Sequence, residues 1–207
     1  MSKRLIAVAA ALLTAGATLT GPTATAAPDS TGPNPTSPNS TTAVTHTYDF
    51  ESADLDSNYD DGETSGYWVD RDTAQAHGGT KSARYRIRSF TSAGKPWIQW
   101  VYYSPQQSAA LPVSISFWVH TTAGGPANTW SAAAYAATTD AHDDTGSPTA
   151  GWQYTSVTQT SGTWKKYTFT TTVNTIGKSE LYTAVGIKAT FPATRTYYID
   201  DATVTVG

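Results

Sequence analysis

Alternation of apolar and polar residues over residues 113 to 120 is the feature of this sequence that most restricts its fold. Val113, Ile115, Phe117 and Val119 alternate with residues that are mostly polar. A period of two places every second side chain on the same side of an extended strand, whereas a helix would spread these residues around its axis. The segment therefore predicts a β-strand with one side in a hydrophobic core.

Similar segments follow one another along the chain. We expect strands at about residues 83–88, 96–103, 113–120, 130–137, 152–159, 164–173, 181–190 and 196–205. Turn residues such as Gly78-Gly79 and Ser161-Gly162 separate them. Many short strands at this spacing predict an all-β fold, a jelly-roll β-sandwich of two antiparallel sheets. The chain has no cysteine, so its stability must come from the core.

The first 26 residues have the features of a secretory signal peptide. Lys3 and Arg4 form a positive start, an apolar stretch follows, and Ala24-Thr25-Ala26 fits the small-x-small pattern of a cleavage site. Residues 27–45 are rich in Pro, Ser and Thr, a composition typical of a disordered leader. We therefore expect a secreted, extracellular protein with one folded domain, residues 46–207.

The charge of the chain restricts its partners. It carries 13 basic and 16 acidic residues, and the expected cleavage removes two of the basic ones. Nucleic-acid binding requires a basic surface, and no apolar stretch has the length of about 20 residues that a membrane-spanning helix needs. We expect no nucleic-acid partner and no membrane partner, and we expect a monomer.

Several segments occur in the order and spacing of a known family. They are His46 to Glu51, Ala76 to Ala83, Val113 to Val119, Gly162 to Phe169 and Tyr198 to Val204. In this respect the chain resembles the calcium-containing jelly-roll carbohydrate-binding modules that are found beside bacterial cellulases and xylanases. The resemblance implies a jelly-roll fold, a structural calcium ion (Ca2+) and glycan binding without chemistry.

The resemblance also implies a metal site. The residues that it assigns to calcium are Glu51, Gly79, Lys81, Asp200 and Asp201. If the first and last strands pair, their carboxylates meet, and a cation between them offsets the repulsion. Calcium accepts carboxylate and carbonyl oxygens in irregular geometry. The alternative needs no metal: these carboxylates are solvated strand ends, or they pair with Arg84 or Lys81.

Aromatic residues are abundant, with 7 Trp and 12 Tyr. Flat rings bind saccharides by lying against the apolar faces of pyranose rings, while amides and carboxylates bind the hydroxyls. On the strand at 113–120, Trp118 and His120 point away from the aliphatic side and form a possible platform. The candidate ligand-binding residues are Trp97, Gln99, Tyr103, Trp118, His120, Trp130, Trp152 and Tyr154.

The register of the strand at 96–103 is open. If Gln99 points outward, Trp97 and Tyr103 join Trp118 on one surface; otherwise Trp100 and Tyr102 point outward. We prefer the first register because an amide is cheaper outside the core.

Three arginines, Arg84, Arg86 and Arg88, line one side of another expected strand. One interpretation is a solvated surface with cross-strand ion pairs. The other is a strip that binds the carboxylates of an acidic glycan, because guanidinium groups match carboxylates.

No recognised catalytic motif is present, so we assign no catalytic residue. The sequence favours a secreted non-catalytic carbohydrate-binding module whose partner is a plant or microbial polysaccharide or oligosaccharide. The alternatives are a small jelly-roll polysaccharide lyase or glycoside hydrolase, and a surface adhesin or protein-binding domain. Whether the protein is an enzyme stays open at this point.

Overall fold

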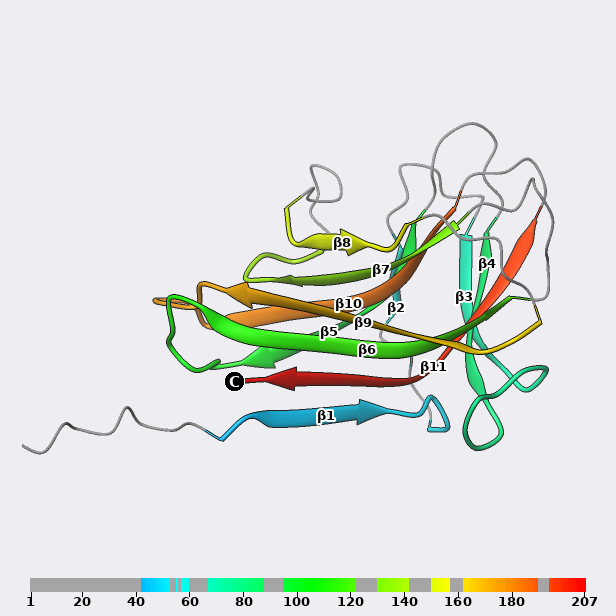
Figure 1. Ribbon diagram of the computed structural model, residues 1–207, viewed down its shortest axis with the longest axis horizontal. Helices are drawn as coiled ribbons and strands as arrows, with labels where there is room; N and C mark the ends of the chain where they lie inside the picture. The colour runs from blue at the N-terminus through cyan, green and yellow to red at the C-terminus, as the bar shows by residue number, and fades with distance from the viewer. Residues whose placement is uncertain are drawn as a thin grey trace, which may run out of the picture. The chain divides into compact units, whose positions relative to one another are not determined.

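Strands make up all of the regular secondary structure in the described part of the chain (Figure 1). The computed structural model describes residues 42–52, 55, 57–59, 67–87, 95–121, 130–141, 150–156, 162–189 and 194–207. All of them belong to one unit, Ser40–Gly207. The expected signal peptide and all but the last residues of the expected leader lie outside the described residues. Within the described ranges, no helix is long and apolar enough to cross a membrane.

The strands form two antiparallel sheets that pack face to face. Sheet A has the order β3–β4–β11–β6–β9, with β1 paired to β11, and sheet B has the order β2–β5–β10–β7–β8. The strands of sheet A are β1 (Val44–Tyr48), β3 (Tyr67–Asp72), β4 (Ser82–Ile87), β6 (Leu111–Thr121), β9 (Lys165–Val173) and β11 (Arg195–Val206). Those of sheet B are β2 (Ser57–Tyr59), β5 (Pro96–Tyr103), β7 (Trp130–Ala137), β8 (Trp152–Tyr154) and β10 (Glu180–Ala189).

The connectivity is that of a jelly roll. The four-strand sets β4–β11–β6–β9 and β5–β10–β7–β8 each combine strands that are distant in the sequence. The expectation of an all-β sandwich with two antiparallel sheets is therefore confirmed.

Strand β6 shows how the alternation builds the core. Val113, Ile115, Phe117 and Val119 are buried, and the residues between them are partly or fully accessible until His120. The buried side chains pack with apolar residues of sheet B, among them Ile98 and Val185. Complete burial of such a side chain contributes about 1.5–3 kcal/mol, which opposes the entropy cost of ordering the strand.

Strand β11 contains an irregularity that matters for the sites described below. Its first part pairs with β4 and its last part with β1, while β6 pairs with both parts. The register shifts between Asp200 and Thr203, and Asp201 has a positive φ of 46°. This β-bulge bends the strand and changes the direction of the acidic side chains. The pairing of the first and last strands, which we considered from the sequence, is present.

Candidate functional site

The outer side of sheet B, turned away from sheet A, carries a group of aromatic side chains. Trp97, Tyr135 and Trp152 form a buried cluster separate from the main core, and Tyr182 packs against it. Two more tyrosines, Tyr103 and Tyr154, extend it at either end. We call these six residues the aromatic face: Trp97, Tyr103, Tyr135, Trp152, Tyr154 and Tyr182.

The register of β5 determines which of its aromatic residues reach this side. Ile98 lies in the main core, and Trp100 and Tyr102 pack against that core. Trp97 belongs to the cluster on the opposite side of the strand. Strand β5 therefore has the orientation that we preferred from the sequence, with Trp97 on the side away from the main core.

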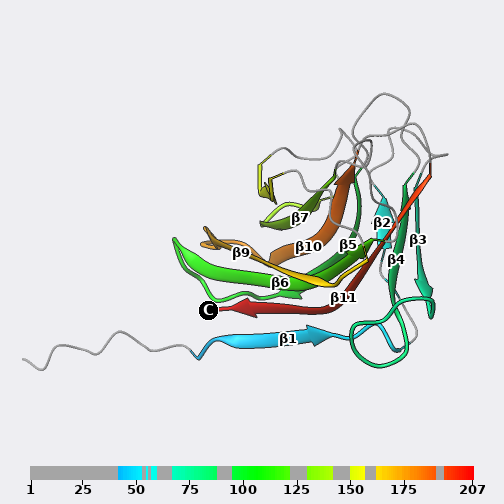
Figure 2. The ribbon, with the colours of Figure 1, turned by 45° about the vertical axis from the view of Figure 1, so that its right-hand side comes forward.

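Small residues form the floor between the rings. Across the sheet, Trp97 pairs with Gly186, Gly186 with Ala133, and Ala133 with Tyr154. A Cβ atom at position 186 would lie 2.6 Å from the carbonyl oxygen of Pro96, so only glycine fits beside β5. Figure 2 shows that β10 curves strongly, with the outer side of the sheet inside the curve. The small residues at positions 133 and 186 are themselves buried, so the larger side chains around them pack closely on this side of the sheet.

The aromatic rings differ in accessibility. Tyr103 is 75 % exposed and Tyr154 is 42 % exposed, whereas Trp97 is fully buried. The Lys95 ammonium group lies 3.8 Å from the ring centroid of Trp152 and 5.4 Å from that of Trp97. The expectation of Trp97 as an exposed platform is therefore wrong. It points to the expected side of the sheet but is covered there, and the tyrosines carry the accessible ring surface.

Gln99 and Tyr135 hold a loop segment against this side of the sheet. The Gln99 amide donates to Asp140 Oδ1 at 2.8 Å and accepts from the Ala141 N–H at 2.9 Å. The Tyr135 hydroxyl donates to the carbonyl oxygen of Thr139 at 2.8 Å. Gln99 is thus buried, and both ends of its amide are occupied by protein groups. Gln99 therefore positions the segment that includes Asp140 and Ala141.

Tyr182 is a polar group at the middle of the aromatic face. Its hydroxyl donates a hydrogen bond to Glu180 Oε2. This bond, with some burial and the negative charge of Glu180, raises the pKa of Tyr182 to about 12. Tyr182 therefore stays a neutral hydroxyl, and Glu180 next to it is an acceptor for hydroxyl groups. The ammonium group of Lys188 lies 4.8 Å from the ring centroid of Tyr154.

The aromatic face borders a groove between β1 and the end of β5. This groove has a volume of about 620 Å3 and is lined by Tyr103, Tyr102 and residues of β1, including Val44 and His46. Tyr103 contributes to both surfaces, so the accessible aromatic area continues around the edge of β5.

Trp118 and His120 lie on the other sheet, and this separates them from Trp97 and Tyr103. β6 belongs to sheet A and β5 to sheet B, so their outer sides face opposite directions. The His77 imidazole stacks on Trp118 with ring centroids 4.0 Å apart. His120 is buried, with Trp164 at 5.3 Å, and burial lowers its pKa. The expected single surface containing Trp97, Tyr103 and Trp118 does not form.

Trp130 is also misplaced by the sequence analysis. It is buried in the main core, in contact with the rings of Tyr167 and Tyr197. As the first residue of β7 it points between the sheets, so it cannot contact a ligand on the outer side. Trp152 and Tyr154 do lie on the aromatic face.

The residues expected to bind calcium converge on one loop. Glu51 Oε1 accepts hydrogen bonds from the N–H groups of Thr80 and Lys81 at 2.6 and 2.7 Å, and Glu51 Oε2 accepts from the Thr80 hydroxyl at 2.7 Å. These bonds, led by that of the Thr80 hydroxyl, lower the pKa of Glu51. The close approach requires Gly79, where a Cβ atom would overlap the Glu51 carboxylate.

Two carboxylates of the β11 bulge contact the same loop. Asp200 is fully buried and accepts hydrogen bonds from the N–H groups of His77 and Gly78 at 2.7 and 3.1 Å. Burial raises the pKa of Asp200 against the effect of these bonds. Asp201 Oδ2 lies 2.6 Å from His77 Nδ1.

This arrangement bears on the calcium prediction in two ways. It brings Glu51, Asp200 and Asp201 to one loop, as a shared ion would require. However, the groups that meet the Glu51 and Asp200 carboxylates are N–H and O–H donors, and a cation would have to displace them. No three His, Asp or Glu side chains among the described residues are grouped closely enough to hold a metal.

The arginine strip forms ion pairs. Arg84 makes a two-point contact with Asp70, with Nε to Oδ1 at 2.8 Å and Nη2 to Oδ2 at 2.6 Å, and also pairs with Asp72. Arg86 contacts Asp70 at 3.3 Å and lies over the Trp68 ring. Arg88 lies outside the described residues. The first interpretation, cross-strand ion pairs, describes Arg84 and Arg86.

Sequence reasoning missed Tyr135 and Tyr182 as members of the aromatic face. The signal was present: Tyr182, Ala184, Gly186 and Lys188 alternate with Leu181, Thr183, Val185 and Ile187, all four of them buried. Applying the period of two to this strand would have placed Tyr182 on the side opposite the core.

Comparison with known proteins supports the fold. No family model and no curated protein matches the sequence. The CBM22-1-CBM22-2 tandem domain of Paenibacillus barcinonensis Xyn10C is 20 % identical with a TM-score of 0.51, over 78 % of this chain and 50 % of that chain. The CBM22-1 xylan-binding domain of the same protein is 18 % identical with a TM-score of 0.49, over 78 % of this chain and 92 % of that one. The C-terminal family 22 carbohydrate-binding module of Clostridium thermocellum Xyn10B is 15 % identical with a TM-score of 0.47, over 78 % and 92 %. The chain thus has the β-sandwich fold of carbohydrate-binding modules.

Proposed function

We propose that this chain is a non-catalytic carbohydrate-binding module that binds a polysaccharide across the aromatic face. The observation that carries the proposal is the accessible ring surface of Tyr103 and Tyr154 on the outer side of sheet B, beside a packed cluster of further aromatic side chains. Aromatic rings exposed to water are costly unless they have a partner. Tyr103 and Tyr154 present such ring surface at two separated points, which suits a ligand with repeating rings.

The polar groups around these rings match the rest of a sugar. The neutral Tyr182 hydroxyl and the Glu180 carboxylate offer a donor and acceptors, and the Lys188 ammonium group beside Tyr154 offers donors. A saccharide has both apolar ring faces and hydroxyl edges, and this surface has partners for each. The likeness to the family 22 tandem domain is consistent with the proposal through the fold alone.

Mutation of the accessible tyrosines tests the proposal. We expect the protein to be retained on at least one of cellulose, xylan, chitin, mannan or pectin in a pull-down, and we expect Tyr154→Ala and Tyr103→Ala each to weaken retention about tenfold or more. Trp68→Ala is the matched control, because Trp68 is also 42 % exposed but lies on β3 of sheet A. The thermal unfolding curves of the variants verify that they are folded.

Three outcomes would overturn this proposal. Retention that survives the Tyr103→Ala/Tyr154→Ala double variant would place binding on another surface. New reducing ends or unsaturated products in the supernatant would show that the protein is an enzyme. An absence of retention on every polymer, with the protein folded, would favour the adhesin or protein-binding alternative.

The calcium ion and the secretion of the protein belong to this proposal as predictions. The support for calcium is that Glu51, Asp200 and Asp201 reach one loop. The support for secretion is the N-terminal sequence alone.

A further inference from the structure

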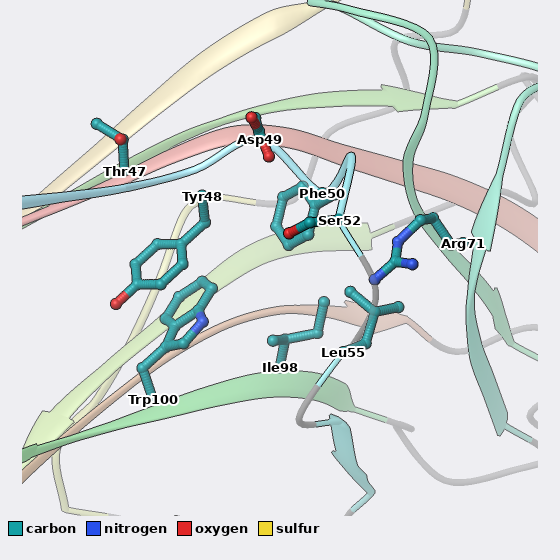
Figure 3. Close-up of a pocket in the computed structure, with 9 residues that line it drawn as sticks. All are labelled: Thr47, Tyr48, Asp49, Phe50, Ser52, Leu55, Arg71, Ile98 and Trp100. Carbon is teal, nitrogen blue, oxygen red and sulfur yellow. The ribbon is translucent and has the colours of Figure 1, made fainter.

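A second, smaller pocket lies on the opposite side of β5 from the aromatic face. It occupies about 240 Å3 between the end of β1, β3 and β5. Figure 3 shows the rings of Tyr48 and Trp100 on one side of it and the Arg71 side chain on the other. Trp100 and Ile98 line it from the inner side of β5. A ligand in this pocket would therefore not touch the aromatic face.

Arg71 is the unusual residue of this pocket. Its side chain is partly buried, and its Nε atom is buried without a hydrogen-bond partner. Among the described residues no ion pair involves Arg71, although Arg84, on the neighbouring strand, pairs with two carboxylates. A buried donor that lacks a partner costs about 1–3 kcal/mol. Among the described residues, no acceptor is recorded for Arg71 Nε and no carboxylate pairs with the Arg71 guanidinium group, which leaves it available for an acceptor from a ligand.

The remaining walls of the pocket favour a ring that carries hydroxyl groups. Tyr48 and Trp100 stack with centroids 4.0 Å apart and form an apolar wall, and Phe50 and Ile98 continue it. Asp49, Thr47 and Ser52 add oxygen atoms. Asp49 Oδ1 accepts the Glu51 N–H at 3.1 Å, and no ion pair links Asp49 to Arg71 among the described residues. Asp49 is exposed, and Figure 3 shows its side chain at the outer edge of the pocket, away from the Tyr48 and Trp100 rings.

The chain turns sharply at the rim of this pocket. Phe50 has a positive φ of 57°, a strained conformation for a residue with a bulky side chain. The turn buries the Phe50 ring in the core while Asp49 and Ser52 still line the pocket. The volume is below the range of about 300–1,000 Å3 typical of sites for drug-sized ligands, so the pocket suits one sugar ring and not a polymer segment.

We propose that this pocket binds a single uronic acid residue, a pyranose ring that carries a carboxylate. The carboxylate forms a two-point, charge-assisted contact with the Arg71 guanidinium group. The ring lies against the apolar wall formed by Tyr48 and Trp100, and the Ser52 hydroxyl accepts or donates a hydrogen bond at the sugar hydroxyls. This binding is independent of the proposed polysaccharide binding on the aromatic face.

Isothermal titration calorimetry with glucuronate tests the proposal. We expect the wild-type protein to bind glucuronate, and Arg71→Gln to weaken binding at least tenfold. Arg71→Lys, which keeps the charge but loses the two-point contact, should give an intermediate affinity. Lys166→Gln is the matched control, because it removes one positive charge from an exposed position on β9, and it should bind as the wild type does. High salt should weaken binding.

Two further ligands separate the sources of affinity. Glucose has the ring without the carboxylate, and acetate has the carboxylate without the ring; each should bind at least tenfold more weakly than glucuronate. The proposal is overturned if glucuronate does not bind, if glucose or acetate binds equally well, or if Arg71→Gln and Lys166→Gln have the same effect. The Tyr103→Ala/Tyr154→Ala variant should bind glucuronate normally, so failure here is distinguishable from failure of the proposed function.

Discussion

At the scale of single residues, a glycine decides how closely the loop at residues 77–81 approaches its acidic partner. Gly79 has a φ of +60°, and a Cβ atom there would overlap the Glu51 carboxylate. Gly177 has a similar φ of +70°, but a Cβ atom there would meet nothing within 4 Å. The two glycines therefore separate the cost of backbone strain from the cost of displacing Glu51.

We expect Gly79→Ala to destabilise the protein more than Gly177→Ala. The positive φ alone should cost each variant about 1 kcal/mol of unfolding free energy. At Gly79 the overlap with Glu51 should add about 1–3 kcal/mol, the usual cost of forcing extra atoms into a packed site. Urea denaturation of both variants measures the difference. Equal losses would mean that the Glu51 contact contributes nothing to stability.

For β5, residue-level prediction from the sequence was correct about direction and wrong about accessibility, whereas Trp130 on β7 points into the core. The period of two left two registers open for this strand, and the cost of burying an amide favoured the one that places Trp97 and Gln99 on the side away from the main core, where both lie. The period of two could not show that Trp152 packs against Trp97, or that the segment with Asp140 and Ala141 covers Gln99, because these contacts join distant parts of the chain. The alternation of a strand specifies a side of the sheet, and the neighbouring loops decide what remains exposed.

At the scale of elements, β3 and β4 are joined by charges across the surface of sheet A. Asp70 lies opposite Arg84 in the register of the two strands, and Asp72 also pairs with Arg84. Both partners of the Asp70–Arg84 pair are partly exposed, with 38 % and 24 % of their side chains accessible. Solvent therefore screens the pair, and its contribution should be modest.

We expect Arg84→Met to lower the free energy of unfolding by about 1 kcal/mol and to leave polysaccharide binding unchanged. The pair lies on sheet A, away from the aromatic face, and its net value at a partly exposed site is small. Denaturation curves at low and high salt measure the loss, which should shrink as salt screens the pair. Weakened retention on the polymer would instead assign Arg84 to the binding surface. It would then favour the interpretation in which the arginine strip binds the carboxylates of an acidic glycan.

Strands were predictable where one side is buried and difficult elsewhere. β6, with its regular alternation, extends only two residues before and one residue beyond the expected 113–120. β3 was missed because it lies at the edge of sheet A, where only Val69 among its residues is buried and the next three are charged. The bulge of β11 was also invisible, because Tyr197 to Asp201 reads as a continuous strand in the sequence.

At the scale of the whole molecule, the sandwich carries three functional candidates. The aromatic face lies on the outer side of sheet B, the Arg71 pocket on the inner side of β5, and the loop that contacts Glu51 and Asp200 beside β11. The aromatic face is separate from the other two, whereas the Arg71 pocket and the Glu51 loop share the segment at residues 49–52, where the Glu51 N–H donates to Asp49 Oδ1.

Removal of calcium tests the prediction for that loop. If an ion binds the folded state there, millimolar calcium should raise the melting temperature relative to excess chelator, by a stabilisation of about 2.7 kcal/mol at 100 times the dissociation constant. Glu51→Gln should abolish the calcium-dependent part of the shift, and magnesium should not replace calcium. Identical melting curves with calcium and with chelator would show that the hydrogen bonds to Glu51 and Asp200 are sufficient without a metal.

The position of β11 also sets the order in which the domain can be completed. This strand follows all the others along the chain, yet it lies in the middle of sheet A, between β6 on one side and β4 and β1 on the other. During synthesis, sheet A cannot close until β11 has left the ribosome, so β1, β4 and β6 must wait with their pairing edges open. Sheet A should therefore form only after β11 has been synthesised, and a nascent chain that lacks β11 should be captured by chaperones or cut by proteases.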